Sequence, residues 1–243
     1  MSDVDFVSTN EAWLILGASS AISRAFAREA AKSGYRILLA GRDTEDLQII
    51  ASDIVIRTGA SVEVLAFDAT GYKSHAKFVA DITAKVPGTL NLFLAFGTMP
   101  EQLAMERDFE LFRKMAETNY LGAVSVLDQF ALVLEDRRRG RVVILGSPSG
   151  ERGRQKNYAY GSTKAALHVY AAGLRARLFR VGVSVTTILP GFVDTAMTWG
   201  MPGLLFLAAP EDLARDVWKA TQKRKDIVHL PKIWALIMLI IRL

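Results

Sequence analysis

The chain has 243 residues and contains no cysteine. Disulfide bonds, thiolate metal ligands and a cysteine nucleophile are therefore excluded. The absence of cysteine also fits a reducing compartment. The first residues are acidic and do not form a basic region followed by an apolar run, which is the pattern of a secretory signal. We therefore expect a cytoplasmic protein.

Histidine is scarce, with only His75, His168 and His229 in the chain. These residues share no ligand spacing with one another or with carboxylates, so the sequence indicates no metal site. A serine hydrolase would need a G-x-S-x-G nucleophile elbow, which is also missing, and the Gly-Ser-Thr of residues 161–163 falls inside a predicted helix. We expect metal-free chemistry and no hydrolysis.

Basic residues outnumber acidic ones by 30 to 25, which gives a formal net charge of +5. The densest basic cluster, residues 137–141, surrounds a predicted turn at Gly140. Proteins that bind nucleic acids usually interleave basic and aromatic residues along one element, and this cluster does not. We interpret it as a solvated loop and predict no nucleic-acid partner.

No apolar run reaches the roughly 20 residues that a membrane-spanning helix needs. The run over residues 233–241 closes the chain between Lys232 and Arg242. It forms either a core or oligomer-interface segment, or an element at a membrane surface with Trp234 and the flanking cations at head-group depth. Both interpretations stay open, the second with peripheral contact at the inner face of the cell membrane through residues 233–243.

Short apolar runs of β type alternate with longer segments of helical period from Trp13 to about Leu230. This alternation predicts a parallel sheet, and strands that are apolar nearly throughout are typical of a sheet covered on both faces. We predict a doubly wound α/β fold in one domain over residues 1–230, with an apolar tail over 231–243. The seven predicted strands are 13–16, 36–40, 62–66, 90–96, 141–145, 183–189 and 227–230.

Small residues follow the first predicted strand and open a predicted helix over residues 21–31, with Gly34 as its C-cap. In such a turn the backbone N–H groups and the positive helix end attract a pyrophosphate. Two serine hydroxyls offer further donors. By itself, however, the turn is as typical of a purely structural strand-to-helix connection. The residues of the turn are Gly17, Ala18, Ser19, Ser20, Ala21 and Ile22.

The second predicted strand is followed by Arg42 rather than by a carboxylate. An arginine at this place pairs with the 2′-phosphate of NADP, whereas an NAD site presents a carboxylate to the ribose hydroxyl. Asp43 follows directly, which keeps NAD(H) open as the alternative. We predict a preference for NADP(H), against the interpretation of Arg42 as an ordinary surface residue.

A more specific pattern is the pair Tyr160 and Lys164 in a predicted helix, with Ser147 upstream at the end of a strand. The i, i+4 spacing places the pair on one helical face. An ammonium beside a phenol lowers the tyrosine pKa from about 10 and makes it a usable acid or base. Ser147 is expected to hydrogen-bond a substrate oxygen and to orient the reacting carbon.

These residues resemble the short-chain dehydrogenase/reductase family over nearly the whole chain. The resemblance implies a Rossmann-like fold and an NAD(P)-dependent oxidoreductase that interconverts a ketone and a secondary alcohol as a homodimer or homotetramer. It also implies a tetrad of Asn119, Ser147, Tyr160 and Lys164. In this tetrad Asn119 bends its helix and holds a water in a proton relay through Lys164.

The same resemblance extends to the cofactor, with Asp68 at the adenine and residues 190–195 at the nicotinamide. Two motifs depart from the family: G-x-x-x-G-x-G becomes Gly17, Ala21 and Ser23, and Asn-Asn-Ala-Gly becomes residues 94–97. We expect a looser approach of helix and strand there, with a shifted cofactor affinity or choice. The expected cofactor residues are Gly17, Ser19, Ser20, Ala21, Ile22, Arg42, Asp68, Ala69, Ala95, Phe96, Gly97, Tyr160, Lys164, Pro190, Gly191, Val193 and Thr195.

A narrower likeness lies in residues 95–97, 119–120 and 147–154 and in the apolar tail. Together they are similar to the reductase subunit of decaprenylphosphoryl-ribose 2′-epimerase. That similarity implies a keto-sugar carried on a polyprenyl phosphate, a role in cell-envelope synthesis and a substrate at a membrane surface. Glu151, Arg152 and Arg154 would then meet the sugar or phosphate, or form a loop salt bridge instead.

Residues 199–209 correspond in this family to a substrate lid, and their apolar side chains indicate an apolar substrate portion. An ordinary core or interface helix is the other interpretation. Two further hypotheses stay open for the chain as a whole: a carbonyl reductase of broad range, and a nucleotide-binding protein of the same fold without catalysis.

Overall fold

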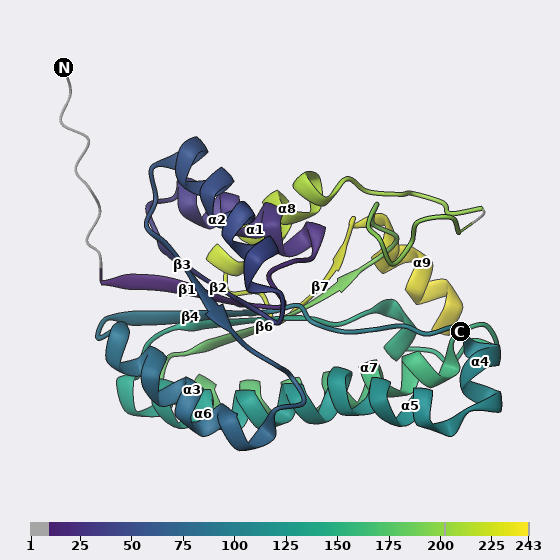
Figure 1. Cartoon of the computed structure of the whole chain (residues 1–243). Coiled ribbons are helices and arrows are strands. Elements are labelled where there is room, and N and C mark those ends of the chain that lie inside the picture. Colours follow the sequence, from purple (N-terminus) through teal and green to yellow (C-terminus); the bar gives the residue numbers. More distant parts are fainter. Residues whose placement is uncertain (1–9, 202, 243) are drawn as a thin grey trace.

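The structure is a computed structural model that describes residues 10–201 and 203–242, apart from the side chain of Arg242. Residues 1–9 of the predicted domain, Pro202 of the predicted lid and Leu243 of the predicted tail lie outside the described residues. Its centre is a seven-stranded sheet of order β3-β2-β1-β4-β5-β6-β7, in which every neighbouring pair is parallel (Figure 1). The strands are β1 Glu11–Leu16, β2 Arg36–Gly41, β3 Val62–Ala66, β4 Thr89–Leu94, β5 Arg141–Leu145, β6 Ser184–Pro190 and β7 Ile227–Leu230.

Helices cover both faces of the sheet, with α1, α2 and α8 on one side and α3, α6 and α7 on the other (Figure 1). The predicted doubly wound fold is confirmed. The helices are α1 Ala21–Lys32, α2 Thr44–Thr58, α3 Tyr72–Lys85, α4 Gln102–Arg107, α5 Phe109–Ala116, α6 Gly122–Arg137, α7 Tyr158–Phe179, α8 Pro210–Gln222 and α9 Ile233–Arg242, with a π-helical turn η1 Glu117–Leu121 and a 3₁₀ turn η2 Pro148–Gly150.

Each strand is apolar on both faces because both faces are covered. Alternate residues of β1 point to opposite sides: Leu14 and Leu16 join the cluster under α3, α6 and α7, whereas Trp13 and Ile15 join the cluster under α1, α2 and α8. The Trp13 ring meets Phe26 of α1 edge-on, with ring centroids 5.0 Å apart. The two apolar clusters therefore hold the sheet between its helix layers.

The strand order reverses between β1 and β4, whose neighbours β2 and β5 lie on opposite sides. In open α/β sheets the ligand crevice opens at this switch point, beyond the carboxyl ends of the strands. Strand β4 ends at Leu94 and not at the predicted residue 96, because the chain leaves the sheet after Ala95, whose N–H bonds Leu16 O of β1 at 2.9 Å. The predicted C-cap of α1 is also displaced: Ser33 caps the helix and Gly34 supplies the following turn at φ 84°.

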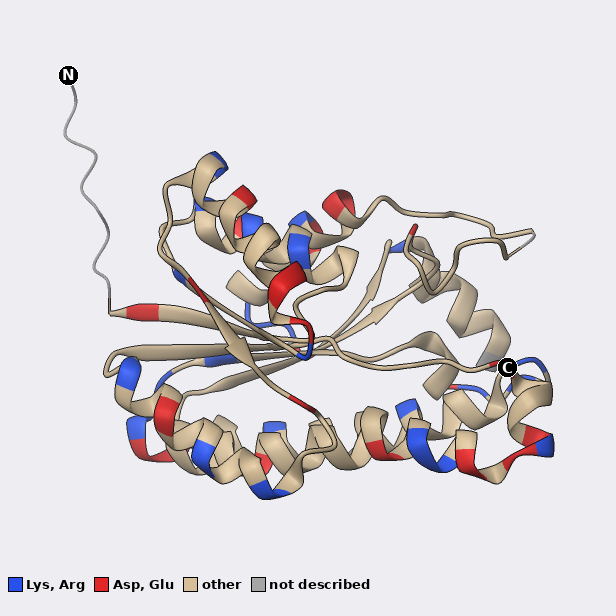
Figure 2. Cartoon of the chain, in the orientation of Figure 1, with Lys and Arg blue, Asp and Glu red and all other residues tan. Residues whose placement is uncertain are grey.

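Helix α9 has two apolar sides. Trp234 and Met238 are buried against the body of the protein, whereas Leu236, Leu239 and Ile240 are exposed. Figure 2 shows hardly any charge along its ribbon. One side of the helix is therefore packed against the protein and the other is uncovered, which leaves both an oligomer interface and a membrane surface open for the exposed side. Among the described helices, none is long and apolar enough to cross a membrane.

Candidate active site

Gly17 begins the turn after β1 at φ 83°, a conformation that side chains disfavour. A Cβ on this glycine would lie 2.7 Å from the backbone nitrogen of Phe96, which leaves β4 directly above. Glycine is thus required here both by backbone conformation and by space. The two chain segments that leave the switch point pack closely at this residue.

Ser23 stands where the family motif has its third glycine, and its side chain is fully buried. Its hydroxyl donates to Gly17 O at 2.9 Å and accepts from the hydroxyl of Ser20 at 2.8 Å. Ser20 also caps α1 by accepting the N–H of Ser23. The hydroxyl therefore ties the first turn of α1 to the glycine turn. Ser20 directs its own hydroxyl hydrogen inward, so it is not the free donor that we expected.

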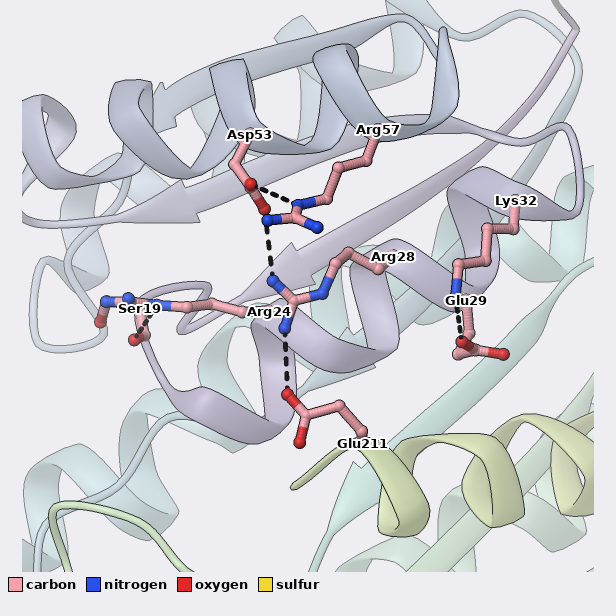
Figure 3. A network of polar contacts seen from close by, with 8 residues as sticks. All are labelled: Ser19, Arg24, Arg28, Glu29, Lys32, Asp53, Arg57 and Glu211. Atoms are coloured by element: carbon pink, nitrogen blue, oxygen red, sulfur yellow. Dashed lines mark hydrogen bonds and ion pairs between the residues drawn. The ribbon is translucent and has the colours of Figure 1, made fainter. Parts of the chain in front are cut away.

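The start of α1 suits an anion, because its first turn has no acidic residue. Arg24 reaches back over the turn, with Nε donating to Ser19 O at 2.9 Å (Figure 3). A terminal nitrogen of Arg24 lies 3.1 Å from Asp46 of α2. In the same view Arg28 joins Asp53 of α2 to Glu211 of α8. The outer face of α1 is therefore held to both neighbouring helices, while its N-terminus stays open.

Arg42 is exposed at the end of β2 and makes no hydrogen bond or ion pair within the described part of the chain. Asp43, its neighbour, caps α2 by accepting the N–H of Asp46 at 3.0 Å, which engages the carboxylate. Asp68, on the loop after β3, accepts the backbone N–H and the hydroxyl of Thr70. These bonds hold the pKa of Asp68 below its ordinary value, and the charge of Arg42 lowers it further.

Phe96 and Gly97 carry the chain from β4 over the crevice. The Phe96 ring packs towards Phe67, with ring centroids 5.8 Å apart, on the side of α3 and α6. A Cβ on Gly97 would lie 3.2 Å from Oδ1 of Asn119 and 3.8 Å from Nζ of Lys164. Gly97 therefore lies directly above two of the predicted tetrad residues.

Asn119 is buried in the π-helical turn between α5 and α6, so the helix is interrupted where the family resemblance implies a bend. Its side-chain oxygen accepts Thr98 N–H and its amide donates to Thr98 O, both at 2.8 Å. Gly122 follows, and a Cβ there would collide with the carbonyl of Ala69, beside Asp68. The turn that contains Asn119 is thus packed against the predicted adenine loop.

Tyr160 and Lys164 lie on the buried side of α7, one turn apart, as the spacing predicts. The Lys164 ammonium donates to Leu145 O, the last carbonyl of β5, at 2.9 Å and lies 5.8 Å from the centre of the Tyr160 ring. Ser147 follows the same strand, and a hydrogen bond from it reaches the Tyr160 side chain. The structure therefore brings the four predicted tetrad residues to one end of the crevice.

The pKa values in this cluster differ from the expectation. Burial raises the pKa of Tyr160 to about 12, although the hydrogen bond with Ser147 opposes the shift. Burial also lowers the pKa of Lys164 to about 8. Within the protein alone, desolvation thus outweighs the stabilisation of the phenolate by the ammonium that we expected. The lysine is closer to neutral than a surface lysine, and the tyrosine is held as the protonated acid.

The segment after β6 is closed off by α9. A Cβ on Gly191 would overlap the indole nitrogen of Trp234, whose ring also meets Phe192 edge-on at 5.2 Å between centroids. Val193 is buried, and the N–H of Thr195 donates to the hydroxyl of Thr198 at 3.1 Å. The predicted nicotinamide segment is thus held in place by the C-terminal helix, a contact that sequence reasoning missed.

The loop after Ser147 also differs from the expectation for a sugar-binding loop. Glu151 is turned inward, with its side chain 6% exposed and Oε2 2.8 Å from Nε2 of His229. Arg154 approaches the sulfur of Met238 on α9 at 3.3 Å, whereas Arg152 is exposed. The alternative of a loop ion pair is therefore the one observed for Glu151.

The three histidines are all engaged, although they look isolated in sequence. His75 bonds Ser125 and the carbonyl of Asp68, both at 2.9 Å, and His168 accepts the N–H of Ser147. Such partners come from distant segments, so no local spacing could have revealed them. Across the described residues no group of three or more histidine, aspartate or glutamate side chains is placed to hold a metal ion.

The model of the family named short chain dehydrogenase matches residues 11–202. The chain belongs to the short-chain dehydrogenase family. The matched region runs from β1 through the glycine turn and the tetrad to the loop after β6, so it contains every predicted site residue. The oxidoreductase class predicted from Tyr160 and Lys164 is thereby confirmed at the level of the family.

Two proteins named as oxidoreductases resemble the chain over most of its length. An uncharacterized oxidoreductase of Mycobacterium tuberculosis, Rv2073c, is 33% identical over 223 residues, which cover 92% of this chain and 88% of the relative. An uncharacterized oxidoreductase from the mprA 5′ region of Streptomyces coelicolor is 36% identical over 183 residues, covering 74% and 71%.

Two solved structures share the fold. A short chain dehydrogenase/reductase family protein is 24% identical with a TM-score of 0.77, and the match covers 91% of this chain and 97% of that one. A variant of actinorhodin polyketide ketoreductase with NADPH is 20% identical with a TM-score of 0.80 and coverages of 92% and 97%. At these identities the likeness extends to the fold alone.

Proposed function

We propose that this short-chain dehydrogenase reduces a ketone to a secondary alcohol with NADPH. The observation that carries the proposal is the convergence of Asn119, Ser147, Tyr160 and Lys164 at the crevice beyond β4 and β5. A bound NADPH would supply the hydride for the carbonyl carbon. The open N-terminus of α1 and the glycine turn at Gly17 fit its pyrophosphate.

Each tetrad residue has a distinct role in this proposal. The Tyr160 hydroxyl gives its proton to the substrate oxygen. Because burial raises its pKa to about 12 in the protein alone, the phenol is protonated at neutral pH and has a proton to give, although it is a weaker acid than an ordinary tyrosine. Ser147 hydrogen-bonds the same oxygen and holds the carbon in place. Lys164, with its pKa near 8, returns a proton towards Tyr160. Asn119 keeps the chain at Thr98 fixed beside them.

The proposed preference for NADPH rests on the charges at the end of β2. Arg42 is exposed and uncommitted among the described residues, whereas Asp43 is engaged in capping α2 and Asp68 in binding Thr70. A guanidinium pairs well with a 2′-phosphate, while no free carboxylate at this strand end is left for a ribose hydroxyl. NAD(H) is the alternative cofactor if Arg42 turns out not to contribute.

The proposed substrate has an apolar, lipid-like portion. Two segments, the loop after β6 and α9, expose apolar side chains, including Trp199 at 84% and Leu239 at 60%. Exposed large apolar side chains in such number are typical of a contact with lipid or protein. A keto-sugar on a polyprenyl phosphate, presented at the inner face of the cell membrane, fits both this surface and the polar crevice. The exposed apolar residues here are Met197, Trp199, Met201, Leu205, Phe206, Leu207, Ile233, Leu236, Leu239 and Ile240.

We further infer a catalytic domain over residues 1–230, with residues 231–243 as an appendage that closes the nicotinamide side through Trp234. We propose that the protein is a cytoplasmic homodimer or homotetramer that contacts the membrane peripherally. A carbonyl reductase of broad range is the second candidate, supported by the contact of the Glu151 carboxylate with His229, which engages one of the polar groups expected to meet a sugar.

The test is ketone reduction by wild type and Tyr160→Phe, followed by NADPH fluorescence. We expect turnover of a polyprenyl-phosphoryl keto-sugar, and a loss of kcat of about 10²–10⁴-fold in the variant. If kcat/KM for small water-soluble ketones equalled that for the polyprenyl-phosphoryl keto-sugar, the broad-range reductase would be favoured. If the protein bound NADPH but reduced no ketone, the result would favour the remaining hypothesis, a nucleotide-binding protein of this fold without catalytic activity.

A further inference from the structure

The backbone of Ser147 is held by a residue outside the tetrad. Its N–H donates to Nε2 of His168 at 3.2 Å, and His168 lies one turn after Lys164 on α7. The imidazole ring occupies a slot between Gly146 and Gly150: a Cβ on the first would overlap Nε2, and a Cβ on the second would lie 2.7 Å from Cε1. Neither glycine has a positive φ, so what each contributes is space.

A second tether holds the same loop from the other side. The Glu151 carboxylate, at the end of the 3₁₀ turn, lies 2.8 Å from Nε2 of His229 on β7. Glu151 and His168 also line one pocket of about 290 Å³ between α7 and the edge of the sheet. The short turn that contains Ser147 is therefore fixed to α7 through one histidine and to β7 through another.

The charged and titratable groups around His168 are few. Among the described residues that line its pocket, Glu151 is the charged one, and β6 and β7 contribute Thr187, Leu189 and Ile227. His229 faces Glu151 from β7. On α7 itself Lys164 lies one turn earlier, with its ammonium bound to the carbonyl of Leu145 and not to the imidazole.

We propose that His168 is a positioning residue that keeps the Ser147 hydroxyl beside Tyr160, and that it does so only while Nε2 is unprotonated. A nitrogen that accepts a hydrogen bond cannot carry a proton, so the neutral ring must hold its hydrogen on Nδ1. Protonation of Nε2 would place its N–H against the backbone N–H of Ser147, so the hydrogen bond between them would be lost and the Ser147 backbone released. This inference rests on the proposed reduction, and it adds an acid-sensitive control of the serine.

The tautomer gives a test that needs no turnover. With ¹⁵N-labelled histidine and serine, NMR of the full chain reports on three imidazoles, which the variants His75→Gln, His168→Gln and His229→Gln assign, and on the serine amides, among which Ser147→Ala assigns Ser147. We expect the Nδ1–H form for His168 at pH 7.5, and a Ser147 amide signal that shifts with the same midpoint as the His168 ring. An Nε2–H tautomer, or a Ser147 amide that does not follow the ring, would overturn the proposal.

Kinetics tests the consequence. His168→Leu keeps the ring space filled but removes the acceptor, and we expect kcat to fall about tenfold to 100-fold with the KM for NADPH unchanged. His168→Gln places an amide oxygen near the position of Nε2, so it should restore most of kcat and remove the acidic limb of the pH profile. The matched control is Val169→Ala, at the next position of α7 and 76% exposed, which should behave as wild type.

The two readouts separate this proposal from the proposed function. If wild type reduces no ketone but His168 shows the Nδ1–H tautomer coupled to Ser147, the reduction is wrong and the tether stands. If wild type reduces ketones and His168→Leu keeps the wild-type kcat and pH profile, the tether does not position the serine and the proposal fails.

Discussion

The two sides of the crevice are built differently. On the cofactor side, contacts are closed: Gly17 touches the backbone of Phe96, and Ser23 fills the glycine position with a buried hydroxyl. On the proposed substrate side, residues 197–201 and 203–207 and α9 leave large apolar side chains exposed. A cofactor site has to fit one molecule that all members of the family share, so its residues can be held rigidly by close packing. A surface for a particular apolar partner has to stay uncovered until that partner arrives.

The largest effect is expected at the closed side, from Gly17→Ala. The new Cβ would meet the Phe96 backbone at 2.7 Å in a positive-φ conformation, so we expect a loss of about 2–5 kcal/mol in the free energy of unfolding and loss of NADPH binding. Gly59→Ala is the matched control, because Gly59 has φ 71° but nothing within 4 Å of its Cβ position. Denaturant unfolding and NADPH fluorescence measure both. Equal losses in the two variants would mean that the close approach to Phe96 contributes nothing.

A smaller effect is expected from the buried lysine. Burial lowers the pKa of Lys164 to about 8, so between pH 8 and its unfolded value of 10.5 the unfolded chain binds more protons than the folded one. Stability therefore rises with pH from 8, until Tyr160, with its pKa raised to about 12, opposes the rise above pH 10. In Lys164→Met the free energy of unfolding should no longer rise between pH 8 and 10. At pH 7 it should exceed that of wild type by on the order of 1–3 kcal/mol.

Unfolding by urea at pH 7, 8, 9 and 10 measures this effect. The control is Lys77→Met, because Lys77 is 80% exposed in an ion pair with Asp81 and should leave the pH profile unchanged. A Lys164→Met protein that is no more stable than wild type at pH 7 would show that the lysine is not desolvated in the folded chain.

The smallest effect on stability is expected at the open side. Trp199→Ser and Leu236→Ser alter exposed side chains, so the free energy of unfolding should stay within about 0.5 kcal/mol of wild type. Binding to anionic vesicles should weaken about tenfold, because each side chain would otherwise be buried among acyl chains. Co-sedimentation measures it, with Ile56→Ser as control, since Ile56 is equally exposed at 84% but lies on α2. Equal vesicle binding by all four proteins would remove the proposed membrane contact.

The sheet could be predicted from sequence because its strands are buried on both faces. Strands 62–66, 141–145 and 227–230 match the structure at both ends, and the others differ by one or two residues. The spacing of Tyr160 and Lys164 likewise predicted that both lie on one side of α7, because helical geometry alone determines it. Where local periodicity controls the outcome, the sequence is sufficient.

Partners from distant segments could not be predicted. His229 on the last strand pairs with Glu151 after β5, and Trp234 packs on Gly191 only because α9 folds back over the sheet. The direction of the Tyr160 pKa was also wrong, because the desolvation that raises it depends on how deeply α7 is buried. Burial is a property of the whole fold and has no local signature.

The hydrogen-bonded hydroxyls of Ser20 and Ser23 at the start of α1 have a consequence for how substitutions at these two positions combine. Ser20 and Ser23 satisfy each other, and Gly17 accepts the hydrogen that remains. Loss of Ser20 removes the cap of α1 and the donor to Ser23, and loss of Ser23 removes the acceptor of Ser20 and the bond to Gly17 O. Substitutions at the two positions should therefore be non-additive, because both remove the same hydrogen bond. A sequence pattern that requires all three glycines of G-x-x-x-G-x-G would miss this chain, although the hydroxyl of Ser23 holds the same turn together.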